Sequence, residues 1–370
     1  MFLDRKHRVI SCHDTWISID PIVGCPFSCQ YCVLRHSNGT GLRPKVICSP
    51  QECVEQLLKY PLFARNVSRL AIGNETDMFH ALNFEYLVEL LLALQETDLK
   101  NQIALITKAR LDAAGLNRIR AIRGLRILFC LSYSGLGRTV EPNFTDDWFR
   151  SNFAIVRDFG FPILHFWRPL LPENSTPEAI ERMLSFVSQF ADASVFVGLK
   201  LHPELTNIIA QEGKIPVPEG RREDIGEWLE PDAIRQIYAI AGQICPDYPL
   251  YRHTSCGLAK IMGCPNHTGT VYRDDICPPS HCPKIQRSVC EVGRRTPAQS
   301  QIEEAIARLE RMPTYFCTED NIVFTSPLSQ EEYAYLVQAL AFPVTGKSVE
   351  LQNLYYGNIN EGRWTPRRRM

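Results

Sequence analysis

The sequence lacks an excess of charge of either sign. It contains 40 Lys and Arg residues against 41 Asp and Glu residues, which gives a formal net charge of -1. A chain with this balance has no overall field that would attract a polyanion, so a nucleic-acid partner would require a local basic patch. The arginine-rich residues 363–370 are a candidate, although a short run of this kind at a terminus is more often simply solvated.

The sequence also lacks any long apolar run. No stretch of about 18 apolar residues is present, and the charged N-terminus does not resemble a signal peptide. We therefore expect a cytoplasmic protein with no membrane partner. In that reducing compartment the 14 cysteines are expected to remain thiols that bind metals or act as nucleophiles, rather than to form disulfides.

The first 200 residues alternate short β-branched, apolar runs with longer amphipathic runs. Repeated βα units of this kind predict an α/β fold with a parallel sheet. Six such units favour a partial (β/α)6 TIM-like barrel, and a flat doubly wound sheet is the alternative with the same periodicity. The expected strands are 16–24, 68–73, 102–107, 125–132, 161–167 and 193–201, and the expected helices lie near 50–59, 83–97, 111–119, 145–158 and 177–190.

The alternation ends near residue 205, which suggests a division of the chain into four parts. We expect a barrel over 1–205, a linker or lid with one helix over 206–250, a Cys-rich module over 251–295 and a helical extension over 296–370. The Cys-rich part has little periodicity, so we expect an irregular fold that depends on a bound metal rather than on an apolar core.

The strongest functional signal is the segment GCPFSCQYC at residues 24–32, directly after the first expected strand. Three thiolates on one short loop, those of Cys25, Cys29 and Cys32, can bind three irons of a [4Fe–4S] cluster and leave the fourth iron open. A structural zinc ion would need a fourth protein ligand, for which His36 or a distant cysteine would have to serve. The spacing therefore favours a cluster over zinc.

This C-x3-C-x2-C spacing, with Tyr31 just before the third cysteine, resembles the defining motif of the radical S-adenosylmethionine (radical SAM) superfamily. The resemblance covers about residues 15–205. It implies that the open iron binds the amino and carboxylate groups of S-adenosylmethionine, and that an electron from the cluster cleaves this cofactor to a 5′-deoxyadenosyl radical. It also implies an electron donor such as a flavodoxin or ferredoxin.

Further residues at the ends of expected strands extend the resemblance. Residues 73–77 stand in the place of the family's Gly-Gly-Glu segment, which meets the methionine amino group, and a strand-to-helix turn is the alternative. Lys108 and Ser132, with residues 141–143 and 157–169, are similar to the spore photoproduct lyase branch, in which a Thr-Lys pair and a serine hold the carboxylate and the ribose. The implied cofactor-binding residues are Tyr31, Gly73, Asn74, Glu75, Thr76, Asp77, Lys108, Ser132 and Arg168.

Arg168 is included because it directly follows the fifth expected strand. Its guanidinium can bind two oxygens of a carboxylate or a phosphate at once. The alternative is an arginine that forms a salt bridge or caps a helix. Lys200 and His202 end the sixth expected strand and would face the same mouth of the barrel.

A second group of cysteines occurs within 35 residues of the Cys-rich part. Metal ligands are expected at Cys256, Cys264, Cys277 and Cys282, and His253, His267 and His281 accompany them. An auxiliary [4Fe–4S] cluster, a structural zinc ion and no metal at all are the three interpretations. Cys290 is a candidate catalytic thiol that donates a hydrogen atom.

We therefore expect an enzyme that cleaves S-adenosylmethionine and abstracts hydrogen from a nucleotide- or nucleoside-type substrate. The reaction class, whether lyase, oxidoreductase or transferase, stays open. Modification of a peptide or small natural product is an alternative that the Cys-rich module favours. A non-catalytic iron–sulfur or zinc protein, acting as a redox sensor or scaffold, is an alternative of another class, but a sensor would have no need for Lys108 and Ser132 at strand ends.

Overall fold

The computed structural model describes residues 8–37, 39–217, 226–266, 282–293, 295–318 and 321–346. Its centre is a nine-stranded sheet with the order β1-β2-β5-β6-β7-β8-β9-β10, in which β11 pairs with β9 from outside this path. The strands are β1 (Ile10–Cys12), β2 (Ile17–Ile19), β5 (Leu70–Ile72), β6 (Gln102–Thr107), β7 (Arg126–Ser132), β8 (Ile163–Leu170), β9 (Ala193–Leu201), β10 (Gly226–Trp228) and β11 (Leu250–Tyr251).

Six of these strands, β2 and β5 to β9, are parallel neighbours in sequence order. A doubly wound sheet would reverse its strand order at a switch point, and this sheet does not. The expected partial TIM-like barrel is therefore confirmed, and the flat alternative is excluded. Strand β1 extends the sheet antiparallel to β2, and β10 closes the other side antiparallel to β9.

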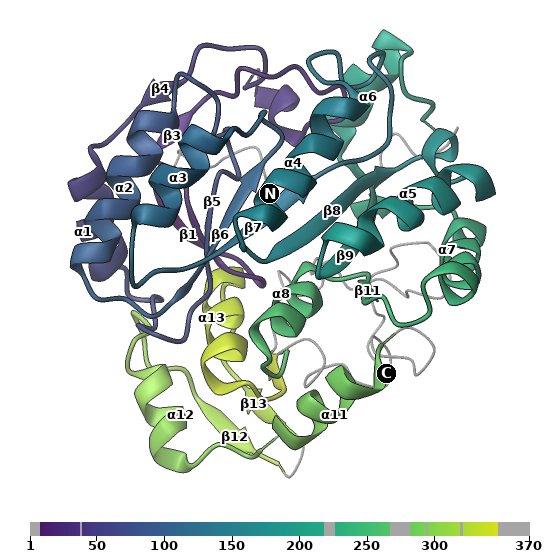
Figure 1. The fold of residues 1–370 in the computed structure, drawn as a ribbon. Coiled ribbons are helices and arrows are strands. Elements are labelled where there is room, and N and C mark those ends of the chain that lie inside the picture. The colour runs from purple at the N-terminus through teal and green to yellow at the C-terminus, as the bar shows by residue number, and fades with distance from the viewer. Residues whose placement is uncertain are drawn as a thin grey trace.

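The helices between the strands cover the outer face of the sheet (Figure 1). They are α1 (Pro50–Lys59), α2 (Phe84–Glu96), α3 (Ala113–Ala121), α4 (Asp146–Asp158), α5 (Pro177–Phe190), α6 (Pro203–Glu212) and α7 (Pro231–Ile244). Their starts follow from local sequence: Thr176 caps α5 ahead of a proline, and Ser49 forms a capping box with Glu52 at α1. The expected boundary at residue 205 falls within α6.

The inner face of the sheet is apolar and is filled by a helix from the Cys-rich part. Leu128, Leu164 and Phe166 pack there with Trp16, and Leu258 of α8 (Thr254–Met262) joins the same apolar group. Helix α8 lies so close to the sheet that a Cβ atom on Gly257 would sit 2.6 Å from a methyl carbon of Leu164. Two helices, α8 and α11 (Lys284–Gly293), occupy most of the described portions of residues 251–295.

The end of the described chain forms a small α/β unit against β1. Helix α12 (Gln299–Ile306) precedes a three-stranded sheet of β12 (Tyr315–Cys317), β13 (Ile322–Phe324) and β14 (Val344–Gly346), and α13 (Gln330–Leu340) lies between the last two strands in sequence. The side chain of Gln338 donates a hydrogen bond to the carbonyl of His13 at 2.6 Å, which attaches this unit to the central sheet.

The remaining short elements flank the barrel. Strands β3 (Ile22–Val23) and β4 (Lys45–Val46) pair with each other, and η1 (Val33–Ser37) and η2 (Pro172–Asn174) are 3-10 turns. No helix within the described ranges combines the length and the apolar character needed to span a bilayer.

Candidate functional site at the carboxyl ends of the strands

The cysteine loop lies at the edge of the sheet where the parallel strands end. Thr76, just after β5, donates a hydrogen bond to the carbonyl of Gly24 at 2.7 Å. The backbone N–H of Ser28 donates to Asn143 Oδ1 at 2.8 Å, and Asn143 belongs to the segment after β7. Because parallel strands bring their carboxyl ends to one edge, these contacts place the loop at the edge where a barrel builds its site.

The three cysteines of the loop are close enough to influence one another electrostatically. Burial raises the pKa of the Cys25 thiol to about 12, and nearby Cys32 contributes to this increase. Burial also raises the pKa of Cys29, against the lowering effect of the Lys108 ammonium. Metal binding would have to displace the protons of these thiols, and three cysteines on one short loop are the donor set that a [4Fe–4S] cluster with one open iron requires.

The same loop is less suited to a single zinc ion. Among the residues that the structure describes, no three His, Cys, Asp or Glu side chains are grouped so as to hold one metal ion. A [4Fe–4S] cluster makes a different demand, because each thiolate binds its own iron and the sulfur atoms surround the cluster rather than meet at one atom.

The segment Gly73–Asp77 is a rigid turn held by a residue that the sequence did not single out, Asp20. One carboxylate oxygen of Asp20 accepts the backbone N–H groups of Asn74 and Glu75, both at 3.1 Å. Gly73 has a φ of +96°, and a Cβ atom there would lie 2.8 Å from the carbonyl of Ile106, so glycine is required. Asn74 donates through its side chain to Ser18 at 2.7 Å.

Asp77 joins the ends of β5 and β6. Its carboxylate accepts hydrogen bonds from the Thr107 hydroxyl and from the backbone N–H groups of Phe79, Lys108 and Ala109, at 2.7 to 3.1 Å. Burial raises the pKa of Asp77, and these hydrogen bonds oppose that increase. With its oxygens engaged by the protein, Asp77 is placed to support the turn that carries Glu75 rather than to bind a ligand directly.

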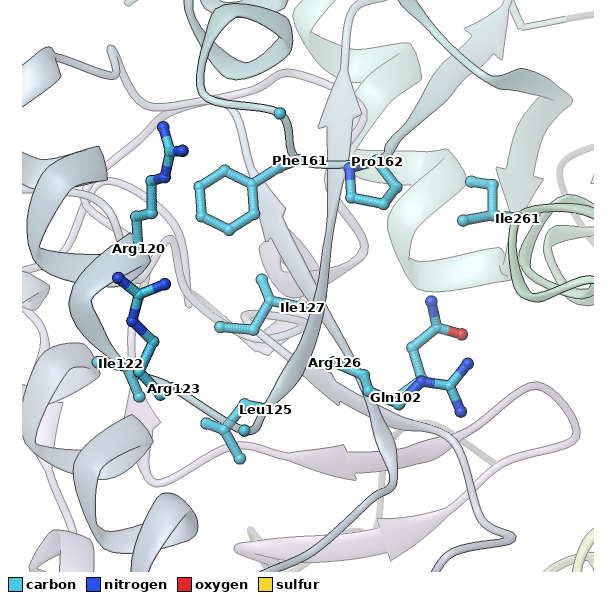
Figure 2. A pocket seen from close by; sticks show the side chains of 12 residues that line it. Gln102, Arg120, Ile122, Arg123, Leu125, Arg126, Ile127, Phe161, Pro162 and Ile261 are labelled. Atoms are coloured by element: carbon cyan, nitrogen blue, oxygen red, sulfur yellow. The ribbon is translucent and has the colours of Figure 1, made fainter.

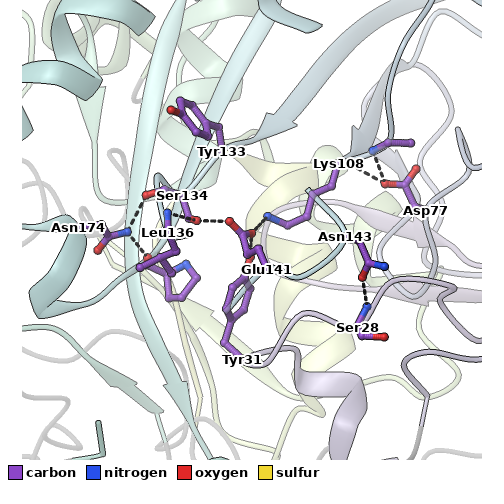
Figure 3. A network of polar contacts seen from close by, with 12 residues as sticks. Ser28, Tyr31, Asp77, Lys108, Tyr133, Ser134, Leu136, Glu141, Asn143 and Asn174 are labelled. Atoms are coloured by element: carbon purple, nitrogen blue, oxygen red, sulfur yellow. Dashed lines mark hydrogen bonds and ion pairs between the residues drawn. The ribbon is translucent and has the colours of Figure 1, made fainter. Parts of the chain in front are cut away.

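A buried carboxylate, Glu141, connects the cysteine loop to the strand ends (Figure 3). Its side chain is 1% exposed. It accepts hydrogen bonds from the Tyr31 hydroxyl, from Lys108 Nζ at 2.6 Å and from the Ser134 hydroxyl at 2.5 Å. Tyr31 and Lys108 are expected as cofactor-binding residues, and the structure brings them together on Glu141, whose position in the site the sequence did not reveal.

Two other expected cofactor-binding residues, Ser132 and Arg168, differ from Lys108 in their polar contacts. Within the described residues, neither the Ser132 hydroxyl nor the Arg168 guanidinium makes a hydrogen bond or an ion pair with the protein. The Arg168 guanidinium lies 3.9 Å from the centre of the Phe166 ring. Burial lowers the pKa of Arg168, while Cys130, Tyr31 and Cys32 act in the opposite direction, which places the cation beside the cysteine loop.

A second charged group lines the barrel where β9 meets β10. Glu227 pairs across the strands with Lys200 and accepts a hydrogen bond from Arg252 at 2.9 Å. Burial raises the pKa of Glu227, but Arg252 and Lys200 lower it by more, so the pKa falls from its ordinary value to about 2. His202 directly precedes α6. Lys200 therefore lies near the mouth of the barrel, as expected, but in the field of a carboxylate.

The cysteines of the Cys-rich part lie at the other end of the sheet. Strand β11 pairs with Ser194 and Val195, at the start of β9, and α8 follows β11 directly. Cys256, Cys282 and Cys290 lie in this region, whereas Cys264 is in contact with the guanidinium of Arg69 at 3.6 Å. Cys277, His267 and His281 lie outside the described residues. Cys290, the expected hydrogen-atom donor, is thus remote from the strand ends that carry the other candidates.

A separate hollow of about 410 Å³ also lies at the amino ends of the strands (Figure 2). It contains Arg120, Arg123 and Arg126 with Phe161 and Pro162, and no acidic residue is part of its lining. This hollow is a local basic patch, and it is distinct from the cysteine loop.

The Glu141 network makes a direct prediction about stability. Glu141→Gln removes the negative charge and leaves the Lys108 ammonium buried without its counter-ion, so we expect the free energy of unfolding to fall by about 3–5 kcal/mol. Glu85→Gln is the matched control, because Glu85 pairs with Arg118 at the surface and should lose less than about 1 kcal/mol. Urea denaturation of both variants measures the difference, and equal losses would show that Glu141 is not a buried counter-ion.

The chain was compared with known families, curated proteins and solved structures. No family model and no curated protein matches the sequence. A mutant of spore photoproduct lyase with bound AdoMet and dinucleoside spore photoproduct matches the structure with a TM-score of 0.54 at 14% identity, covering 68% of this chain and 81% of that chain. Spore photoproduct lyase complexed with dinucleoside spore photoproduct matches with a TM-score of 0.50 at 15% identity, covering 63% and 75%. The chain therefore has the fold of spore photoproduct lyase.

Proposed function

We propose that the chain is a radical SAM enzyme, and that Cys25, Cys29 and Cys32 hold its [4Fe–4S] cluster. The observation that carries this proposal is the position of the three thiols, on one loop at the carboxyl edge of a parallel barrel and in contact with the residues expected to bind the cofactor. When bound, the cluster and S-adenosylmethionine would supply a 5′-deoxyadenosyl radical that abstracts hydrogen from a substrate. The shared fold with a protein that binds AdoMet supports this assignment.

The chain's own residues would divide the work of holding the cofactor. The turn carrying Glu75 is fixed by Asp20, and in this proposal it would meet the methionine amino group. The open guanidinium of Arg168 is suited to the carboxylate, since it can bind two oxygens, and Ser132 can both donate to and accept from a ribose hydroxyl. Lys108 is already neutralised by Glu141, so its contribution is to position Tyr31 and the loop through that carboxylate.

The substrate class that we propose is a nucleotide or nucleoside. Support comes from the shared fold with spore photoproduct lyase, whose structures contain a dinucleoside photoproduct. Lys200, which lies at the end of β9 and pairs with Glu227 across the strands, is at the mouth of the barrel and would contact an anionic group of the substrate. A reduced flavodoxin or ferredoxin is the proposed electron donor, since the cluster must receive one electron for each cleavage.

The cofactor-cleaving function can be tested on the cysteine loop. Reduced, reconstituted protein incubated with S-adenosylmethionine should release 5′-deoxyadenosine, and the Cys25→Ala/Cys29→Ala/Cys32→Ala variant should release none above background, because it lacks the thiolates of the cluster. Cys317→Ala, which removes an exposed thiol in β12 of the C-terminal unit, is the control and should keep the activity. Undiminished cleavage by the triple variant would falsify the assignment.

The role of Arg168 can be tested by cofactor binding alone. Arg168→Gln should weaken the binding of S-adenosylmethionine by roughly 10- to 100-fold, as expected for the loss of a hydrogen-bonded charge pair. Arg123→Gln is the matched control, because this arginine lines the distant hollow and should leave binding unchanged. Isothermal titration of the reconstituted, unreduced protein measures both, and an unaltered dissociation constant for Arg168→Gln would remove this residue from the cofactor site.

The substrate class can be tested by coupling. A dinucleotide or nucleoside substrate should accelerate the release of 5′-deoxyadenosine above the slow rate seen with the cofactor alone, and deuterium on the substrate should appear in the released 5′-deoxyadenosine. Peptides of similar size serve as the comparison. Acceleration and deuterium transfer with peptides alone would contradict the nucleotide assignment while leaving the radical SAM function intact.

A further inference from the structure

Three cysteines and one buried tyrosine lie in the same region, at the amino-terminal half of β9. Tyr251 in β11 pairs with Val195, and it belongs to the same apolar group that Cys256 and Cys282 contact. Cys290 lies close to Cys256, because one residue, Asn266, hydrogen-bonds to the sulfur atoms of both. The three thiols come from α8, from the position two residues before α11 and from α11 itself, so the fold brings together cysteines that are up to 34 positions apart.

Polar N–H groups are directed at the sulfur atoms of these cysteines. Asn266 is 1% exposed, and its backbone N–H donates to Cys290 Sγ at 3.4 Å while its side-chain amide donates to Cys256 Sγ at 3.1 Å. Gln286, also buried, donates to Cys290 Sγ at 3.5 Å. A neutral thiol is a weak acceptor, whereas sulfur bound to a metal is regularly stabilised by hydrogen bonds of this kind.

The tyrosine itself indicates that a group belongs between the thiols. Tyr251 is 3% exposed, and its hydroxyl has no hydrogen-bond partner in the described part of the chain. Buried hydroxyls are nearly always paired, so an unpaired one needs an explanation. An acceptor placed among the three thiols, such as a sulfide of a metal cluster, would satisfy it.

We propose that Cys256, Cys282 and Cys290 bind a second iron–sulfur cluster, with Asn266 and Tyr251 as hydrogen-bond donors to its sulfur atoms. Three thiolates can bind three irons of a cubane cluster, each at its own corner, so they need not converge on one atom. Cys264 is not part of this set, because its sulfur faces Arg69 instead. Cys290 is accordingly a metal ligand in this proposal and not a hydrogen-atom donor. The second site is independent of the cofactor-cleaving function proposed for the first.

The cluster can be counted on the full chain. Anaerobically reconstituted protein should contain about eight irons and about eight sulfides, four of each for every cluster. The Cys256→Ala/Cys290→Ala variant should contain about four of each. Cys264→Ala is the matched control, since it removes a cysteine of the same region that lies outside the proposed site, and it should keep about eight.

The count also separates the two sites. In the Cys25→Ala/Cys29→Ala/Cys32→Ala variant about four irons should remain if the second site binds its own cluster, whether or not the first site cleaves the cofactor. Loss of all iron from that variant would overturn the proposal. Eight irons in the Cys256→Ala/Cys290→Ala variant would also overturn it. The same holds if the unaltered chain contains one zinc ion and the Cys256→Ala/Cys290→Ala variant contains none.

Tyr251→Phe provides a second test that does not remove a ligand. It should keep the iron count but shift the midpoint potential of the cluster that survives in the Cys25→Ala/Cys29→Ala/Cys32→Ala background, toward more negative values, because a hydrogen bond to cluster sulfur is lost. Tyr133→Phe, at a buried tyrosine on the helix-covered face of the sheet, is the control and should leave the potential unchanged. An identical potential in both variants would overturn the contact between Tyr251 and the cluster.

Discussion

One buried carboxylate holds the candidate site together. Glu141 accepts hydrogen bonds from Tyr31 on the cysteine loop, from Lys108 after β6 and from Ser134 after β7, so three segments that are distant in sequence meet on its two oxygens. A buried charge is costly unless it is paired and hydrogen-bonded, and here it is both. The geometry of the cysteine loop relative to Ser132 and Arg168 therefore depends on Glu141, while Asp20 and Asp77 stabilise the neighbouring turn in the same way.

The two ends of the barrel have different characters. At the carboxyl ends of the strands, open polar groups and a loop of thiols lie beside one another, as required for binding a charged cofactor. At the amino ends, α8 packs against the inner face of the sheet at Gly257, and Tyr251 and the second group of cysteines adjoin it (Figure 1). Because apolar side chains close the barrel at the amino ends of the strands, a ligand would enter at the carboxyl ends. The apolar surroundings at the amino ends would also suit a thiolate-bound cluster, which could stabilise the Cys-rich part of the chain.

The parts of the molecule that could be predicted are those with local signals. Several elements are observed with the bounds that the sequence predicted: the strands 102–107 and 193–201 and the helices 50–59 and 177–190. Their signals, the hydrophobic periodicity and the capping residues, come from residues that are close together in the sequence. Asp20 and Glu141 could not be found in this way, since the turn that Asp20 supports begins 54 residues away, and Lys108 and Tyr31 lie 33 and 110 residues from Glu141. For the same reason Lys108 was expected to bind the carboxylate of the cofactor, whereas in the structure its ammonium pairs with the carboxylate of Glu141. Strand β10 was missed because its pairing with β9, rather than its own periodicity, determines it. Helix α6 carries local signals that were not used to predict it, Pro203 in its first turn and a left-handed Gly213 at its end.

The central claim is that an iron held by the cysteine loop has a coordination site open to S-adenosylmethionine. The most direct measurement is electron paramagnetic resonance of the reduced, reconstituted chain before and after addition of the cofactor, with isotopically labelled methionine amino nitrogen to detect coordination. An open iron on this loop predicts a cluster signal that changes on addition of the cofactor and shows coupling to the labelled nitrogen. In the Cys25→Ala/Cys29→Ala/Cys32→Ala variant this change and coupling should be absent, and the signal of the second cluster should not respond to the cofactor. A signal that is indifferent to the cofactor in the unaltered chain would contradict it.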